Sequence, residues 1–200
     1  MIRKIIIIIC GIIFMAFGTG LCNYTNFGID PFNALCVGSS NMLNISLGTF
    51  TLVAQFIIAV LILFIQKRFL GIGSLVPMIS FGYILQVINE VMESVLPTSM
   101  SIIASFVLFG VGMVCIALVM SLYMNCDLGM VPYDAVSFSI SEKINKNPFL
   151  LRVIIDVSIA SLAFLVGGPI QVGTILLAFG IGPILKVFKP ITNKVIKRAS

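Results

Sequence analysis

The sequence predicts an all-α polytopic membrane protein with six spanning helices and two short broken or re-entrant helices, arranged as two inverted-topology repeats of three spans. The first reason is composition: of the 200 residues, 60% are hydrophobic and 10% are charged, whereas soluble domains have about 45–50% and about 25%. The second is that apolar runs long enough to cross about 30 Å of hydrocarbon recur along the whole chain. The third is a motif that occurs once in each half, at 27–35 and at 128–136.

Composition also excludes several function classes. The net charge is +5, but the basic residues cluster beside apolar runs, which indicates membrane orientation and argues against a nucleic-acid partner. The chain has no histidine, and its five cysteines show no C-x-x-C spacing, so we expect no metal site, no cofactor and no disulfide framework. We expect the cysteines to be buried as small hydrophobic residues. No nucleophile–base pair is visible, and we therefore do not expect an enzyme.

The first repeat, 1–99, contains three predicted spans, at 5–23, 48–66 and 72–89. The first span is longer than the apolar core of a signal peptide and lacks an A-x-A cleavage site, so we expect it to remain uncleaved. Segment 31–44 lies between the first two spans. It is too short and too polar for an ordinary span, and it fits a re-entrant half helix packed inside protein.

The second repeat, 100–200, has the same order, with predicted spans at 101–124, 149–166 and 171–188 and a short segment at 132–145. The short segment ends in charged residues, and a Gly-Gly-Pro sequence separates the last two spans. A strongly basic tail follows the last span, and we expect it to contact anionic lipid.

The positions of lysine and arginine favour six spans over eight. If the two short segments do not cross the membrane, all basic clusters lie on one side of it. The loops 90–100 and 167–170, which carry no basic residue, then lie on the other side. If the short segments cross, Lys67 and Arg68 face away from the basic N-terminus, which breaks this rule. We therefore expect a bacterial cytoplasmic membrane protein with both termini in the cytoplasm.

The two halves match each other at an offset of 101 residues in their first parts and of 100 residues in their last parts. The matched pairs include Gly11 and Gly112, Gly28 and Gly129, Pro31 and Pro132, Asn33 and Asp134, Gly73 and Gly173, and Gly82 and Gly182. Because each half holds an odd number of spans, the second half enters the membrane from the opposite side. Many secondary transporters are built in this way, with binding sites on discontinuous helices near the membrane midplane.

The candidate site lies where the two short segments begin. We expect Gly28 and Gly129 to break the chain, and Pro31 and Pro132 to occupy the first helical positions, where the missing N–H of proline has no cost. The N-terminus of a half helix exposes free N–H groups and a partial positive charge, so two converging ends can hold an anion or a carboxylate. The alternative is that these residues only end one helix and start the next.

Polar residues near these breaks are the candidate substrate-binding residues. We expect Asp30 to cap the first short helix, a role that no side chain fills in the second copy. Asn33 and Asp134 occupy equivalent positions, with Tyr133 beside Asp134, and a structural cap is the alternative role for Asp134. Gln55, within the second span, is a weaker candidate, for which an ordinary interhelical hydrogen bond is the alternative.

Asp156 is the candidate ion-coupling residue. A carboxylate within a span is costly, and such groups usually face a cavity or a partner. Arg152 lies four residues earlier on the same helical face, so an ion pair between the two residues is the alternative to a coupling role. The sequence leaves both readings open.

The second copy of the motif also carries a family resemblance. Leu128–Val136 reads L-G-M-V-P-Y-D-A-V and resembles the L-G-x-x-P-W-D-x-L motif of the uncharacterised bacterial YczE/YyaS/YitT membrane protein family, with Tyr133 in place of tryptophan. Gln171–Thr174 and Gly180–Pro183 resemble the glycine-rich signatures of that family near its last span. The first-half copy departs further from the motif. The resemblance covers nearly the whole chain and implies a multi-spanning inner-membrane protein without a settled activity.

We predict a small secondary transporter or permease for an unidentified small solute. Its expected partners are the lipid bilayer and that solute, and the sequence leaves a homo-oligomer open. One alternative is the substrate-binding membrane subunit of a larger importer of the energy-coupling-factor type. Another is a membrane protein that serves assembly or regulation and transports nothing. The sequence does not determine the substrate, the direction of transport or the coupling ion.

Overall fold

The computed structural model describes residues 2–97, 100–126 and 129–199, and all regular structure within these ranges is helical. The helices are α1 (Ile2–Tyr24), α2 (Pro31–Leu43), α3 (Leu47–Ile65), η1 (Lys67–Phe69), α4 (Ile72–Val95), α5 (Ile102–Cys126), α6 (Pro132–Ile144), α7 (Pro148–Leu165) and α8 (Val172–Ala199). Outside the described part lie Leu128 and the side chains of Arg3, Lys4, Cys126, Lys186, Lys197 and Arg198. The all-α class is confirmed, and each expected span or short segment corresponds to a helix.

Within the part of the chain that the structure describes, four helices are long and apolar enough to cross a membrane. Their apolar stretches are Ile6–Tyr24, Leu47–Ile65, Gly73–Val95 and Ile102–Asn125. The two arms of α8, Val172–Leu185 and Val187–Lys194, meet at 50° and provide a fifth crossing if they are counted as one span. The described chain therefore has several spanning helices, as a polytopic membrane protein requires.

Apolar side chains cover much of the outer surface. Phe64, for example, is 86% exposed on α3. Soluble proteins rarely expose such extended apolar surface, whereas contact with lipid tails explains it. Cys10 is part of this exposed surface, so the expectation of burial is wrong for Cys10 and correct for Cys22, Cys36 and Cys115.

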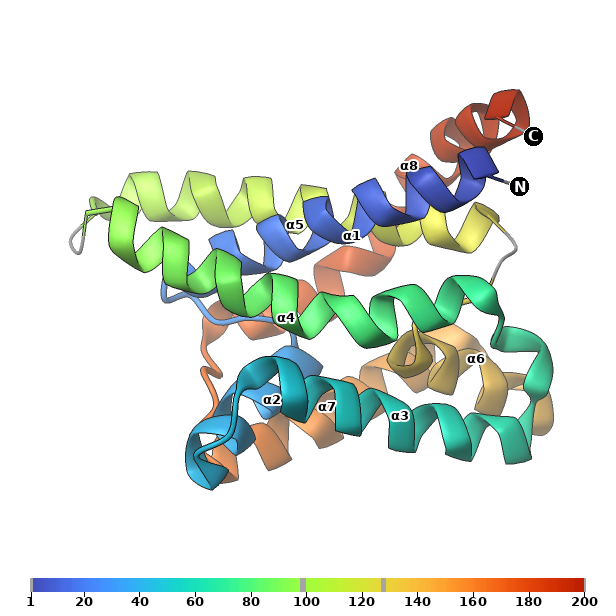
Figure 1. Cartoon of the computed structure of the whole chain (residues 1–200), viewed down its shortest axis with the longest axis horizontal. Coiled ribbons are helices and arrows are strands. Elements are labelled where there is room, and N and C mark those ends of the chain that lie inside the picture. Colours follow the sequence, from blue (N-terminus) through green and yellow to red (C-terminus); the bar gives the residue numbers. More distant parts are fainter. Residues whose placement is uncertain (1, 98–99, 127–128, 200) are drawn as a thin grey trace.

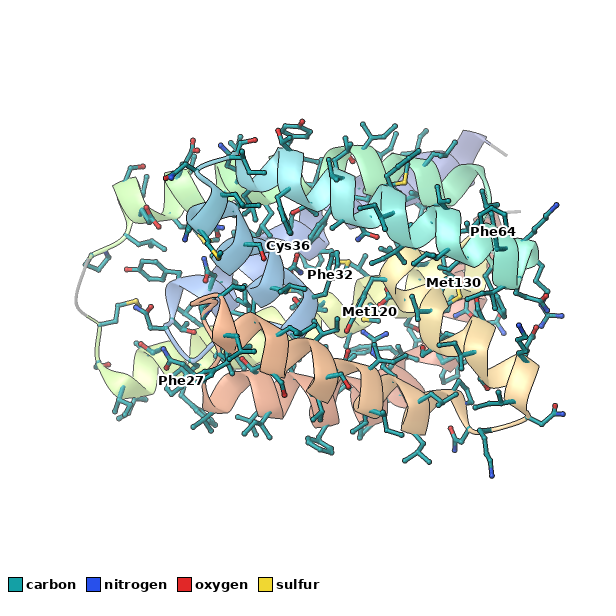
Figure 2. All side chains as sticks on the ribbon, turned by 90° about the horizontal axis from the view of Figure 1, so that it is seen from below. Phe27, Phe32, Cys36, Phe64, Met120 and Met130 are labelled. Carbon is teal, nitrogen blue, oxygen red and sulfur yellow. The ribbon has the colours of Figure 1, made fainter. Side chains whose placement is uncertain are left out.

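The helices form two layers (Figure 1). In that view α1, α4, α5 and α8 lie in the upper layer, and α2, α3, α6 and α7 lie in the lower one. The short helices α2 and α6 each pack against both α3 and α7. Figure 2 shows α2 and α6 end to end between these two longer helices, with Phe32 near the centre. The first turns of the two short helices therefore meet in the interior of the protein.

Glycines allow α1 and α5 to approach closely at the centre of the upper layer. A Cβ atom on Gly112 would lie 2.6 Å from the carbonyl oxygen of Gly18, and a Cβ atom on Gly18 would lie 2.8 Å from the Cβ atom of Cys115. Backbones therefore touch where the helices cross. Such contacts replace the hydrophobic effect as the source of helix association in lipid.

The loop before each short helix is held by the opposite half of the chain. The carbonyl oxygen of Phe27 accepts a hydrogen bond from the backbone N–H of Gly173 at 2.7 Å. The carbonyl oxygen of Phe69 accepts one from the N–H of Met130 at 2.9 Å. The first loop is thus joined to the start of α8, and the second loop is joined to the turn that leads into α4.

The expected end of the third span is wrong. Helix α4 continues to Val95, so Glu90 and Glu93 lie on the helix and not in a connecting loop. Pro97 disfavours the helical conformation in the residue that precedes it, which explains why the helix ends where it does. Only a short connection then leads to α5.

The expected end of the last span is also wrong, because α8 continues through Pro183 and Pro190 to Ala199. Each proline removes one backbone hydrogen bond and crowds the preceding turn, which bends a helix without always ending it. The 50° bend of α8 lies close to Pro183. The basic tail is consequently helical.

Candidate functional site

The two short helices begin with different caps. Asp30 caps α2: one carboxylate oxygen accepts a hydrogen bond from the backbone N–H of Asn33 at 3.1 Å, and the other accepts one from its side-chain amide at 2.7 Å. Helix α6 has no such cap, because the residue before Pro132 is Val131. Instead, the side-chain oxygen of Gln55 on α3 accepts a hydrogen bond from the N–H of Tyr133 at 3.3 Å. A side chain from another helix thus satisfies a free N–H at the start of α6.

The second residues of the two short helices are in direct contact. The rings of Phe32 and Tyr133 stack with their centroids 4.6 Å apart and their planes 21° from parallel. Both side chains are buried. This contact joins the two helix starts, and the next residue of each helix, Asn33 or Asp134, lines the same cavity.

A buried charged cluster lies beside this contact. Arg152 on α7 places Nη1 2.9 Å from a carboxylate oxygen of Asp134 and Nε 3.6 Å from a carboxylate oxygen of Asp156. The hydroxyl of Tyr133 donates a hydrogen bond to the second oxygen of Asp156 at 2.5 Å. The side chains of Arg152, Asp134 and Asp156 are only 21%, 12% and 4% exposed. The ion pair between Arg152 and Asp156 therefore exists, but Asp134 is the closer partner of the guanidinium.

The cluster is adjacent to two cavities. The central cavity has a volume of about 40 Å³ and is lined by residues of both halves, including Asp30, Asn33, Gln55, Tyr133, Asp134 and Arg152. The side cavity lies between α5, α6, α7 and α8, has a volume of about 150 Å³ and is lined mostly by apolar side chains. Asp134 and Arg152 line both cavities. A third space of about 10 Å³ separates Asp30 from Asp156 and Arg152.

The structure brings the candidate residues together. The proposed binding residues Asp30, Asn33, Gln55, Tyr133 and Asp134 and the proposed coupling residues Arg152 and Asp156 all line this set of cavities. The proposed chain-breaking glycines have positive φ angles, +98° at Gly28 and +108° at Gly129, and Pro31 and Pro132 begin their helices. Gln55, which the sequence ranks as a weak candidate, is thus a structural partner of α6.

Sequence reasoning did not single out three further side chains of the site, those of Phe32, Phe81 and Met120. Phe32, Phe81 and Tyr123 line the central cavity, and Met120 lines both cavities. Figure 2 shows Phe32 and Met120 near the middle of the molecule. Phe81 and Met120 stand in continuous apolar runs, where a residue facing a cavity has the same sequence pattern as one facing lipid. Only Phe32 had a signal, its position opposite Tyr133 in the repeat.

Comparisons with known proteins agree with the membrane assignment. A family model described as "Family of unknown function (DUF6198)" matches residues 2–190. The chain belongs to this family. Two Bacillus subtilis proteins that are similar to this chain confirm the resemblance to the YczE/YyaS family. The "Uncharacterized membrane protein YczE" is 28% identical over 90% of this chain and 82% of its own length. The "Uncharacterized protein YyaS" is 24% identical over 92% and 91%.

A Haemophilus influenzae protein is also similar to this chain. This "Uncharacterized protein" is 25% identical over 93% of the present chain and 83% of its own length. No solved structure matches the chain. The comparisons thus establish a membrane protein family.

Removal of the Tyr133 hydroxyl is expected to destabilise the protein. The variant Tyr133→Phe keeps the ring stack with Phe32 but leaves an oxygen of buried Asp156 without its donor, which costs about 1.5–3 kcal/mol when the acceptor is charged. Ser121→Ala is the matched control, because it removes a buried hydroxyl that bonds the neutral Thr192 outside the site. Thermal unfolding of the detergent-solubilised protein should show the larger loss for Tyr133→Phe. Equal losses in the two variants would contradict a charged partner.

Proposed function

We propose that this DUF6198 protein is a small secondary transporter or permease. Its solute binds between the first turns of α2 and α6, at the interface of two inverted-topology repeats, 1–99 and 100–200. The observation that carries the proposal is a buried, charged site at the meeting point of two discontinuous helices. Transporters of this construction use such helix ends to hold polar solutes near the membrane midplane.

The symmetry of the contacts supports the repeat. In a two-fold arrangement, a contact between two positions has a second copy in which the two halves exchange roles. A Cβ atom on Gly11 would lie 3.3 Å from Val119, and one on Gly112 would lie 2.6 Å from the carbonyl oxygen of Gly18. At the offset of 101 residues, Gly11 corresponds to Gly112 and Gly18 corresponds to Val119. The contact of Gly11 with Val119 is therefore repeated as the contact of Gly112 with Gly18. Phe32 and Tyr133 are equivalent to each other, so their stack lies on the axis.

The loops before the short helices follow the same rule. A Cβ atom on Gly28 would meet the hydroxyl of Thr174, and one on Gly129 would meet the hydroxyl of Ser74, each at 2.5 Å. The short helices also end alike, at Asn44 and Asn145, which have φ angles of 53° and 51°. Repeated contacts of this kind are expected for a duplicated unit. The alternative of an importer subunit does not require them, and we therefore do not favour it.

The six-span topology completes the proposal. Helices α1, α3 and α4 cross in the first repeat, and α5, α7 and α8 cross in the second. Helix α2 enters and leaves the membrane on the outer side, and α6 enters and leaves it on the cytoplasmic side. Helix α7 crosses despite Arg152 and Asp156 because both side chains face the interior. The basic ends of the chain then lie in the cytoplasm of a bacterial cell.

Cysteine labelling tests this topology. In a cysteine-free background, we expect Lys67→Cys and Glu93→Cys to react with a membrane-impermeant maleimide from opposite sides, because the exposed side chains lie at opposite ends of α4 and its preceding turn. Labelling of intact cells should therefore modify the cysteine at 93, and inverted vesicles should modify the cysteine at 67. Modification of both from the same side would contradict the six-span model.

Alternating access follows from the two repeats. Rocking of one repeat against the other about the Phe32–Tyr133 contact would open the central site to each side in turn. Asp156 is the proposed carrier of the coupling proton or cation, because its two partners, Arg152 and Tyr133, both lie at the repeat interface. A change in the contacts across the repeat interface, where α2 packs against α7 and α3 packs against α6, would then alter the charge balance of the site.

Reconstitution tests transport directly. Purified protein in liposomes is given a mixture of amino acids, amines, nucleosides and organic acids under imposed proton and sodium gradients, and mass spectrometry identifies what accumulates. We expect uptake of at least one solute and a loss of about tenfold or more in Asp134→Asn, because a charged hydrogen-bond partner is removed. Asn125→Ala is the control, since Asn125 bonds α8 outside the cavities. If no solute moves with correctly inserted protein, the proposal is wrong.

A further inference from the structure

The described residues that line the central site include more acidic than basic side chains. Among the described residues that line it, Asp30, Asp134 and Asp156 are acidic and only Arg152 is basic. Arg152 is shared by Asp134 and Asp156, and the hydrogen-bond partner of Asp30 is the neutral Asn33. A buried carboxylate without a counter-charge is costly, above all inside a membrane. The site therefore favours a positively charged occupant.

The described lysine and arginine side chains elsewhere do not supply this charge. Those that lie outside the site are exposed at the protein surface (Lys67, Arg68, Lys143, Lys146, Lys189 and Lys194). No group of three or more histidine, cysteine, aspartate and glutamate side chains among the described residues is arranged to hold a metal ion. An organic cation supplies the missing positive charge.

An unpartnered acceptor further defines the occupant. The side-chain oxygen of Asn33 has no hydrogen-bond partner within the described structure, although Asn33 is only 4% exposed and lines the central cavity. Its amide nitrogen is already used by Asp30 at 2.7 Å. A buried acceptor without a partner is costly, so a ligand that donates a hydrogen bond gains at this position. A quaternary ammonium lacks such a donor, whereas a protonated amine has one.

The two cavities match the two parts of such a molecule. The central cavity, about 40 Å³ in volume, exceeds what a single water needs and has aromatic rings of Phe32, Phe81 and Tyr123 in its wall. Aromatic faces attract cations. The adjoining side cavity of about 150 Å³ is mainly apolar, with Met124, Phe138 and Phe179 in its lining. It provides space for a hydrocarbon body next to the charged end.

We propose that the site binds a protonated primary amine with an apolar body. The ammonium group lies in the central cavity, where it donates hydrogen bonds to the free oxygen of Asn33 and to the carboxylates of Asp30 and Asp134. The apolar body lies in the side cavity. This inference rests on the proposed function, since it names the class of solute for the transport site. Carboxylates and other anions are excluded as solutes, because they would add to the negative charge.

Binding of three matched probes tests the proposal. The purified protein is equilibrated with 2-phenylethylammonium, with neutral 2-phenylethanol and with anionic 3-phenylpropionate, which share one apolar body. We expect the ammonium compound to bind at least about tenfold more tightly than either other probe, in equilibrium dialysis and as a rise in unfolding temperature. Tighter binding of the alcohol or of the anion would overturn the proposal, as would no detectable binding of the amine.

A variant locates the binding position. Asn33→Ala should weaken binding of the amine about tenfold, whereas Asn125→Ala, the same substitution outside the cavities, should leave it unchanged. Equal affinities in both variants would place the amine elsewhere and overturn the assignment. If Asn33→Ala does not fold, the ranking of the three probes on the unmodified protein decides the question. Transport is measured separately in liposomes. Uptake of another solute class would refute the proposal that the solute is an amine and would leave the proposed transport function unaffected.

Discussion

The variant Arg152→Leu is expected to lose about 3–5 kcal/mol of stability, because it leaves the buried carboxylate of Asp156 and the largely buried carboxylate of Asp134 without a shared counter-charge. The guanidinium contacts them through different nitrogens, Nη1 and Nε. Lysine has a single ammonium group and cannot reproduce this geometry, so Arg152→Lys should also be destabilised. Unfolding by sodium dodecyl sulfate in mixed micelles measures these losses.

Two comparisons separate this effect from a general loss of charge. Arg68 also pairs with a carboxylate, that of Glu142, but its side chain is 65% exposed, so Arg68→Leu should cost only about 0–1 kcal/mol. Adding Asp134→Asn and Asp156→Asn to Arg152→Leu should restore much of the stability, because the unpaired charges are then removed. A triple variant no more stable than Arg152→Leu would contradict the electrostatic explanation.

The second large effect is expected from the glycines that precede the short helices. A Cβ atom on Gly28 would lie 2.5 Å from the hydroxyl oxygen of Thr174 and 2.9 Å from the backbone nitrogen of Gln171. One on Gly129 would lie 2.5 Å from the backbone nitrogen of Gly71 and from the hydroxyl of Ser74. Positive φ angles at both glycines add strain of about 1–3 kcal/mol, and overpacking adds about as much.

We therefore expect Gly28→Ala and Gly129→Ala each to be severely destabilised, with broadened elution in size-exclusion chromatography and a lower unfolding temperature. Gly110→Ala is the matched control in α5, because no atom lies within 4 Å of a Cβ atom at that position. It should be neutral or slightly stabilising, since alanine favours helix by up to about 1 kcal/mol over glycine. Wild-type stability in either loop variant would show that the loops do not require these contacts.

The sequence predicted the helices well where the composition and the helix-breaking residues agree. Long apolar runs indicated the long helices, and Gly28 with Pro31 and Gly129 with Pro132 indicated where the short helices begin. It failed at the ends of two helices: α8 does not end at 188 but continues to Ala199, and α4 does not end at 89 but continues to Val95. Packing against neighbouring helices can hold a helix through a proline or a charged residue, and this stabilisation is not visible in a local pattern.

The composition and the recurring motif by themselves determined that the chain is a helical membrane protein with a short helix after each copy of the motif, because solvation in lipid dictates both the apolar runs and the satisfaction of backbone groups. The polar residues at corresponding positions could also be named, since they are rare among apolar neighbours. Only the tertiary structure decided their pairing: Arg152 with Asp134 from another helix, and Gln55 with the start of α6. Such pairs depend on the relative placement of α3, α6 and α7, which distant contacts set and local sequence does not encode.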